Sequence, residues 1–565
     1  MADQQGRKTG RTPLAKILEV LRLEREDITS VYLYAILNGL IQLSLPLGIQ
    51  SIISFVLGGS ISTSLVLLIV GVVTGVLLTG LVQVSQMRII EKVQQKLFVR
   101  YAFEYAHRIP NLDLKSIDGY HLPETVNRFF DTISLQKGIA KLLLDFPTAT
   151  IQILFGLILL SFYHPFFIAF SFVLVGLVGA ILYYSGQRGM STSIEESDYK
   201  YGVGAWLEEL ARVVASFKFS KGGQLHLERT DGLVQGYLVA RTAHFRILQL
   251  QYWTLVMFKL VITAGMLIVG SFLLIDQQLN LGQFIAAEIV ILLVLNSVEK
   301  LIINLEKVYD VLTSVEKLSK VIEKPLEAHG RVVLPDGGRG MRIAMNGLSF
   351  SHAGRQVLHD ITFDIPSGSR VAIRGGDGSG KSTLLRLLCG VYPDYAGGIT
   401  VDGISLRDFE GDSYRRQTGV LLGLQDIFQG TLLENITMGD DRIHASDIMD
   451  LAERIGLNDF IRELPSGLAS PIDPVGKRLP RSITQKVLLL RALAGKPRLL
   501  LLEEPWRGMD PANAERIRRY LLDSGDGCTL FVVSNDAEFQ ARADITLELQ
   551  DGRLTRLDRR DAGRG

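Results

Sequence analysis

Long apolar stretches recur along the first half of the chain, separated by polar connections. Each stretch is close to 20 residues or longer, and a helix of about 20 apolar residues crosses roughly 30 Å of hydrocarbon. We therefore predict membrane-spanning helices at residues 31–57, 61–84, 144–162, 166–184, 250–275 and 281–303.

The connections between these stretches are of two kinds. Three are short and hold no Lys or Arg, whereas the long connections near residues 86–141 and 185–246 hold many. Cytosolic loops carry the excess of basic residues, so the long connections and both termini are predicted to be cytosolic. The long connections also have helical periodicity, which predicts that the spanning helices continue below the bilayer.

The second half of the chain has a different pattern. Residues 341–350 alternate like a strand, residues 371–373 end a short apolar run, and the four leucines at 499–502 are typical of a parallel strand buried on both faces. Residues 529–534 predict another such strand. This half is therefore predicted to be an α/β domain.

The predicted domain boundaries follow from these patterns. Pro and Gly punctuate residues 314–340, which we interpret as a linker. The prediction is a cytosolic segment at 1–30, a transmembrane domain with six helices at 31–313, the linker at 314–340 and the α/β domain at 341–560.

Composition narrows the possible partners and the compartment. Hydrophobic residues make up 47% of the 565 residues, which agrees with membrane segments. The formal net charge is +1, so bulk charge predicts no nucleic-acid partner. The two cysteines, Cys389 and Cys528, exclude a disulfide framework and favour a reducing cytosol. The first thirty residues are charged and polar, so we predict no signal peptide.

One glycine-rich stretch carries the chemistry of the second half. It follows an apolar run and precedes a helical pattern, which is the context of a phosphate-binding loop. Its residues are Gly375, Gly376, Asp377, Gly378, Ser379, Gly380, Lys381, Ser382 and Thr383. Lys381 is expected to reach the terminal phosphates of a nucleoside triphosphate and the Ser382 hydroxyl to bind Mg²⁺. The alternative is a glycine turn before a helix.

Polar residues within the predicted spans need partners, because hydrocarbon offers none. Asn38, Gln42, Pro46 and Gln50 recur every four residues and share one helix face. They either bond neighbouring helices or line a polar cavity.

Two charged residues also lie within the predicted spans. Lys259 is in the fifth span and Glu288 in the sixth. A charge at that depth is far less costly when it is paired, so we predict that these two residues neutralise each other. The alternative is that Glu288 faces a wet cavity as a substrate or proton site.

The combination of six spanning helices, two long cytosolic connections and a nucleotide domain resembles a half-size ABC exporter. Ser44-Leu45-Pro46-Leu47, and Arg108-Ile109-Pro110 to Arg128, are similar to the type I secretion (haemolysin-type) branch. Many members of that branch begin with a cysteine-protease-like domain, which we do not expect here because the first predicted span starts near residue 31. The resemblance implies a six-helix transmembrane domain of the type I ABC exporter fold, followed by an α/β P-loop ATPase domain that binds ATP and Mg²⁺.

Further residues match positions of the family. His352 stands where an aromatic ring, usually Tyr, stacks on adenine. Glu503 replaces the Asp that, together with Ser382, orients Mg²⁺, and Glu504 matches the catalytic base that polarises water. Asp510 matches the acidic residue that communicates across the dimer. The alternative for the two glutamates is a solvated strand end.

Three further sites depart from the family. Gly423 replaces the glutamine that joins the metal site to the membrane domain, although Gln425 lies two residues on. Asn535 replaces the histidine that binds the γ-phosphate, and an amide cannot carry a proton at pH 7. The LSGGQ signature becomes Leu479-Pro480-Arg481-Ser482-Ile483.

The altered signature affects how the partner subunit's phosphate is held. Pro480 has no N–H to offer that phosphate, whereas Arg481 adds bulk and either obstructs it or supplies a charge. Ser482 to Gln485 fits a capping box for the helix that follows.

The resemblance implies an ATP-hydrolysing half-transporter in a bacterial inner membrane, with low turnover because of these departures. It also implies a second ABC half-transporter as partner, and a periplasmic adaptor as in secretion relatives. We favour a homodimer over a heterodimer. The alternative is a membrane-anchored ATP-binding regulator or assembly partner with little turnover. The substrate cannot be derived from the sequence.

Overall fold

The computed structural model describes residues 12–58, 63–117, 122–335, 337–338, 340–352, 354–472, 479–523 and 527–560. The chain divides into two compact units. The first comprises Met1–Leu112 and Gly119–Pro325, and the second comprises Asp113–Asp118 and Leu326–Gly565. The boundary in sequence therefore lies between Pro325 and Leu326, within the predicted linker.

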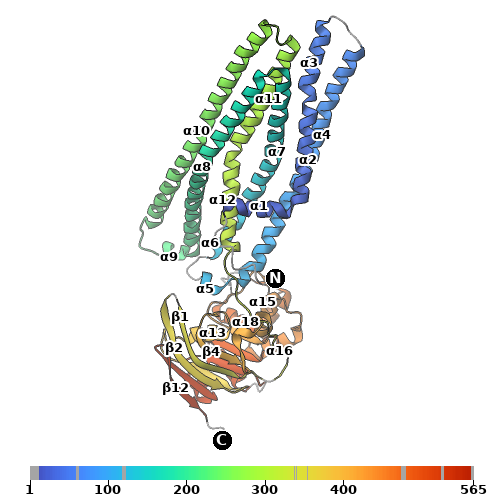
Figure 1. The fold of residues 1–565 in the computed structure, drawn as a ribbon. Helices are drawn as coiled ribbons and strands as arrows, with labels where there is room; N and C mark the ends of the chain where they lie inside the picture. Colours follow the sequence, from blue (N-terminus) through green and yellow to red (C-terminus); the bar gives the residue numbers. More distant parts are fainter. Residues whose placement is uncertain are drawn as a thin grey trace. The chain divides into compact units, whose positions relative to one another are not determined.

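The described residues of the first unit form helices joined by short turns and loops (Figure 1). Short 3-10 turns lie at Ile109–Asn111 and Arg128–Phe130. The helices are α1 (Pro13–Leu23), α2 (Arg25–Gln42), α3 (Ser44–Leu57), α4 (Thr63–Arg108), α6 (Leu122–Asn127), α7 (Asp131–Tyr163), α8 (Phe166–Arg212), α9 (Val214–Lys218), α10 (Leu225–Ile275), α11 (Leu281–Ile303) and α12 (Leu305–Ile322).

The described residues of the predicted spans lie in these helices, apart from a break at Leu43, and residues 61–62 of the second predicted span lie outside the described residues. By length and composition, five helical segments of the described residues can cross a membrane: Arg25–Leu57, Thr63–Asn111, Thr125–Tyr163, Leu225–Ile275 and Leu281–Ile322. The fourth predicted span lies in α8, whose apolar segment Phe166–Ile181 is shorter. The predicted continuation of the helices is confirmed, since α4, α8 and α10 extend far past the apolar stretches.

Two helix boundaries differ from the prediction. The first span is broken at Leu43, between α2 and α3. Pro46 has no N–H to bond the carbonyl of Gln42 and its ring crowds that carbonyl, which accounts for the break. At the other end, α12 continues to Ile322, so the first part of the predicted linker is helical.

The polar face of the first span bonds neighbouring helices. Gln152 on α7 donates to the Gln42 side chain and accepts a hydrogen bond of 2.7 Å from Ser297 on α11. Tyr163 OH donates to Gln50 Oε1 at 2.7 Å, and Asn38 is 2% exposed. These contacts favour the interhelical interpretation of the polar face.

The predicted pairing of Lys259 with Glu288 is wrong. Lys259 Nζ lies 2.5 Å from Glu299 Oε2, eleven residues after Glu288 along α11. Glu299 is three helical turns from Glu288 and therefore on the same face. An estimate of depth along the helix, taken alone, therefore selected Glu288 when the partner on that face is Glu299. Glu288 Oε2 is buried without a hydrogen-bond partner among the described residues.

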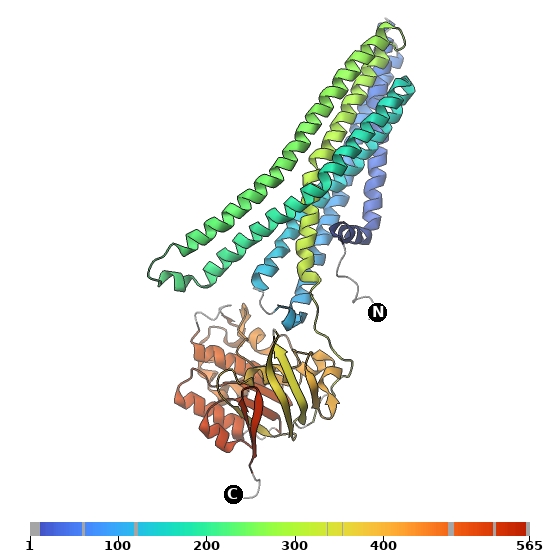
Figure 2. The same cartoon turned by 60° about the vertical axis from the view of Figure 1, so that its left-hand side comes forward.

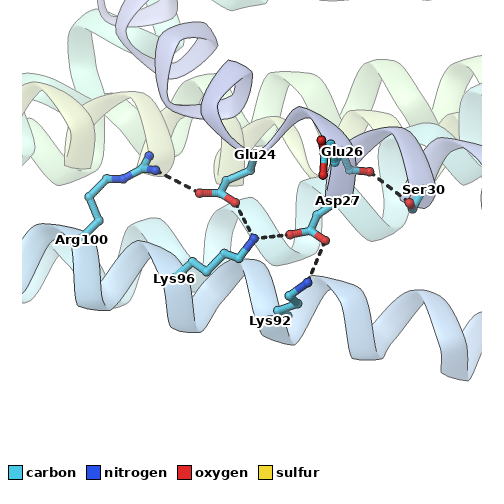
Figure 3. Close-up of polar contacts among 7 residues, drawn as sticks. All are labelled: Glu24, Glu26, Asp27, Ser30, Lys92, Lys96 and Arg100. Atoms are coloured by element: carbon cyan, nitrogen blue, oxygen red, sulfur yellow. Dashed lines mark hydrogen bonds and ion pairs between the residues drawn. The ribbon is translucent and has the colours of Figure 1, made fainter.

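Long helices and one ion-pair cluster organise this unit. Figure 2 shows α8 and α10 running side by side, joined through α9. Near the start of α2, Glu24 and Asp27 bind Lys92, Lys96 and Arg100 of α4 (Figure 3). This cluster ties the N-terminal end of α2 to α4.

The second unit is an α/β domain, as predicted. Its six-stranded sheet has the order β12-β11-β3-β10-β9-β6, with β12 antiparallel to β11 and the other neighbours parallel. An antiparallel sheet has the order β2-β1-β4-β5, and β7 pairs with β8. The strands are β1 (Ile343–His352), β2 (Arg355–Ile365), β3 (Arg370–Arg374), β4 (Ala396–Val401), β5 (Ile404–Ser405), β6 (Thr418–Leu421), β7 (Gly430–Thr431), β8 (Pro471–Ile472), β9 (Leu499–Glu503), β10 (Thr529–Val533), β11 (Ile545–Gln550) and β12 (Arg553–Arg559).

Helices and two apolar cores surround this sheet. The helices are α5 (Leu114–Ile117), α13 (Lys381–Leu388), α14 (Gly411–Arg415), α15 (Leu432–Thr437), α16 (Ala445–Ile455), α17 (Asn458–Glu463), α18 (Arg481–Leu493), α19 (Pro511–Asp523) and α20 (Ala537–Arg542). Along β9, Leu499 and Leu501 belong to one core and Leu500 and Leu502 to the other. Because alternate side chains point to opposite faces, β9 is buried on both, as predicted.

Candidate nucleotide site

The glycine-rich loop connects the end of β3 to the start of α13. Gly375 has φ +152° and an added Cβ there would lie 2.2 Å from the carbonyl oxygen of Leu549. Gly380 has φ +95° and a Cβ would lie 2.5 Å from Leu358. Glycine is therefore required at both positions for the backbone to follow this path.

The exposed part of the loop is open. A Cβ added at Gly376 or Gly378 meets nothing within 4 Å. Asp377 is exposed, whereas Ser379 is 5% exposed. Backbone N–H groups at the start of a helix attract anions, so this side of the loop has the space and the polarity for a phosphate.

Lys381 and Ser382 begin α13 and make different contacts. Lys381 Nζ donates to the carbonyl oxygens of Gly375 (2.8 Å) and Gly376 (2.7 Å). The Ser382 hydroxyl donates to Glu503 Oε1 at the end of β9. Thr383, the last residue of the motif, is half-buried on the same helix.

Glu503 connects three segments that are distant in sequence. Its Oε1 accepts from Ser382, and its Oε2 accepts from the Gly423 N–H at 3.0 Å. A side chain one methylene longer than aspartate therefore reaches the Ser382 hydroxyl. The Gly423 contact could not be found from the sequence, because it uses a backbone N–H.

Glu504 directly follows β9 in an unusual backbone conformation, with φ +45°. Its N–H donates to the carbonyl oxygen of Val533 at 2.9 Å, and Gln485 donates to its carbonyl oxygen at 3.2 Å. Burial raises the pKa of the Glu504 carboxyl, against the opposing effect of Arg507 and Lys381. A carboxylate with a raised pKa beside a phosphate loop suits a general base.

The remaining candidates lie around this centre. Asn535 follows β10, the strand between β3 and β9, and is exposed. Since the carboxyl ends of parallel strands meet at one edge of a sheet, it is placed near the loop and Glu504. His352 ends β1, and its ring is edge-on to Tyr392 at 6.3 Å.

The altered signature begins α18. Pro480 is the N-cap of this helix, without a side-chain capping bond, so the predicted capping box from Ser482 to Gln485 is wrong. Gln485 bonds the Glu504 carbonyl instead. The stem of Arg481 lies beside Gly508, where an added Cβ would be 3.7 Å from its Cδ.

Two other predicted site residues are held by local contacts. Gln425 accepts a hydrogen bond of 3.1 Å from the Leu422 N–H within its own turn. Asp510 bonds both the N–H and the side chain of Asn513, which lowers the pKa of its carboxyl.

Family models match both units. Residues 30–298 match the model described as ABC transporter transmembrane region, and residues 358–507 match ABC transporter. A solved structure of a bacterial Atm1-family ABC exporter with ATP bound is similar to this chain, with a TM-score of 0.80 and 19% identity. The match covers 95% of this chain and 95% of that structure's chain. That likeness shows the fold.

Curated relatives include secretion proteins. The type I secretion system ATP-binding protein PrsD of Rhizobium meliloti is 29% identical over 53% of this chain and 51% of its own. The alpha-hemolysin translocation ATP-binding protein HlyB of Escherichia coli O157:H7 is 28% identical over 50% of this chain and 40% of its own. The matched part thus spans about half the length of these relatives.

Proposed function

We propose that this chain, which belongs to the ABC transporter family, couples ATP binding and slow hydrolysis to export. It has the exporter arrangement of a transmembrane domain followed by a nucleotide-binding domain. The substrate is unidentified, and the membrane is a bacterial inner membrane with both termini in the cytosol. The contact of Ser382 and Gly423 with the Glu503 carboxylate carries the proposal.

The residues present fit ATP and Mg²⁺. An open glycine loop faces solvent, and a hydroxyl and a carboxylate meet beside it. In this proposal the loop N–H groups and Lys381 bind phosphates, and His352 supports adenine. Ser382 and Glu503 hold Mg²⁺, which neutralises phosphate charge. Glu504 accepts a proton from the attacking water, and Asn535 donates a hydrogen bond to the γ-phosphate.

Low turnover follows from the altered residues. Pro480 caps α18 and has no N–H for a partner's phosphate. Gln425 is held within its own turn. The groups that bind ATP are thus retained, whereas the groups that close the site against the partner subunit and couple it to the membrane domain are weakened. The retained Lys381, Ser382 and Glu504 favour a transporter over a regulator without turnover.

ATP turnover by the purified full chain in lipid nanodiscs tests this proposal. We expect turnover below the median enzyme rate of about 10 s⁻¹. Glu504→Gln should abolish it while ATP still binds, and Lys381→Ala should lose nucleotide binding. Glu453→Gln, at an exposed position on α16, is the matched control. Faster turnover, or unchanged turnover in Glu504→Gln, would contradict the proposed roles.

The partner in this proposal is a second ABC half-transporter, and we favour a second copy of this chain. A periplasmic adaptor is the further partner, since the names of PrsD and HlyB specify secretion and translocation. Co-purification from the native host with mass spectrometry tests both. A stoichiometric second ABC subunit would overturn the homodimer.

A further inference from the structure

A groove of about 740 Å³ lies between α4 and α7 of the first unit. This volume is in the range of about 300–1,000 Å³ that small-molecule sites have. Its walls combine apolar side chains with three cations and one carboxylate. Those that carry the argument are Val84, Met87, Arg88, Glu91, Lys137 and Leu144.

The cations of α4 differ sharply in their partners. Arg88, Lys92, Lys96 and Arg100 recur every four residues. Lys92, Lys96 and Arg100 are each bound to Glu24 or Asp27 (Figure 3). Arg88 is exposed, and the described residues hold no ion pair to it. The cluster of Figure 3 thus leaves out the one cation of this row that lines the groove.

The facing helix adds cations to the same groove. Lys137 is exposed and also has no ion pair among the described residues. Lys141 is bound to Asp145 at 3.1 Å, and Glu91 accepts a hydrogen bond from Gln95. Arg88 and Lys137 are therefore two like charges in one groove, an arrangement that an anion between them would stabilise.

The groove lies at a predicted membrane surface. Val84 and Leu144 are the cytosolic ends of the second and third predicted spans. Arg88 lies about one turn below Val84, and Lys141 and Lys137 lie about one and two turns below Leu144. Apolar walls therefore adjoin the hydrocarbon, and the cations lie at the level of lipid headgroups. Basic pockets between membrane helices on the cytosolic side bind anionic headgroups.

We propose that this groove binds an anionic phospholipid. The phosphate lies between Arg88 and Lys137, and the acyl chains follow Val84, Met87 and Leu144. Charge complementarity and the order of apolar and basic walls along the groove select this occupant over a free anion, which would leave the apolar wall uncovered. This site is separate from the nucleotide site, so it stands or falls independently of ATP hydrolysis.

Thermal unfolding of the full chain tests the proposal, in nanodiscs of phosphatidylcholine with and without phosphatidylglycerol. The wild type should melt at a higher temperature with phosphatidylglycerol. Arg88→Gln/Lys137→Gln should lose most of this shift and bind phosphatidylglycerol about thirty-fold more weakly, because each such cation contributes roughly a factor of five. Native mass spectrometry measures the retained lipid. The matched control is Lys92→Gln, on the same helix but paired with Asp27, which should keep the shift.

Three results would overturn the proposal. The first is an equal phosphatidylglycerol shift in the double variant and the wild type. The second is an equal stabilisation by inorganic phosphate in phosphatidylcholine nanodiscs, which would indicate an anion site without lipid. The third is a disulfide between two copies through Lys137→Cys, which would show that a second copy covers the groove.

Discussion

Replacing Glu24 by Gln should destabilise the first unit through its contact with Arg100. Glu24 Oε1 lies 3.0 Å from Arg100 Nη2, and the Glu24 side chain is only 8% exposed. Arg100 Nη1 is buried without a hydrogen-bond partner among the described residues, so the loss of Glu24 leaves this guanidinium poorly compensated. Lys96 retains its contact with Asp27 at 2.5 Å.

The expected magnitude lies between two limits. Removing one partner of a fully buried ion pair costs about 3–5 kcal/mol, whereas an exposed pair contributes roughly 0.2–1 kcal/mol. The Arg100 side chain is 36% exposed, so water screens part of its charge. We therefore expect a loss of about 2 kcal/mol, which lowers the melting temperature of a unit of this size by about 3 °C.

The assay is thermal unfolding of the purified full chain at a fixed scan rate, because large proteins unfold irreversibly. Glu209→Gln is the matched control, since its pair with Arg212 is exposed on both sides. Glu24→Gln combined with Arg100→Gln should cost less than the two separate losses added together. Additive losses, or a loss no larger than in the control, would refute the reasoning.

Two further predictions concern the nucleotide site and the membrane pair. Burial raises the pKa of Glu504, and a general base must be deprotonated, so ATP turnover should fall as pH decreases through a value above the ordinary 4.5. A pH–rate profile that stays flat down to that value would contradict this. In a double-mutant cycle on detergent stability, Lys259→Met should couple with Glu299→Gln and add simply with Glu288→Gln; the reverse would restore the overturned pairing.

Local patterns predicted most of the fold. The strand, glycine loop and helix around Lys381 are fixed by residues adjacent in sequence, and the four leucines of β9 indicate burial on both faces without any tertiary information. The apolar stretches likewise placed the membrane helices, because their length is set by the bilayer.

The wrong predictions arose where the rotation of residues about the helix axis, or competition between two local sequence signals, decides the contact or the helix boundary. Helical rise gave the depth of Lys259 but could not choose between Glu288 and Glu299, which share a face. A four-residue capping motif starting at Ser482 was overridden, since the helix begins earlier, at Arg481, with Pro480 as its N-cap. Pro46 was assigned to the polar face of the first span by its four-residue spacing, although its missing N–H is what divides α2 from α3.

The length of α10 has a mechanical consequence. The helix has 51 residues, which makes it about 76 Å long, whereas the hydrocarbon of a bilayer is about 30 Å thick. The predicted span at residues 250–275 leaves residues 225–249 outside it, about 38 Å of helix, with α8 packed alongside. A pivot of the pair by about 5° at the membrane surface would move its far end by roughly 3 Å. A small rotation of these two helices would therefore produce a displacement about as large as a side chain.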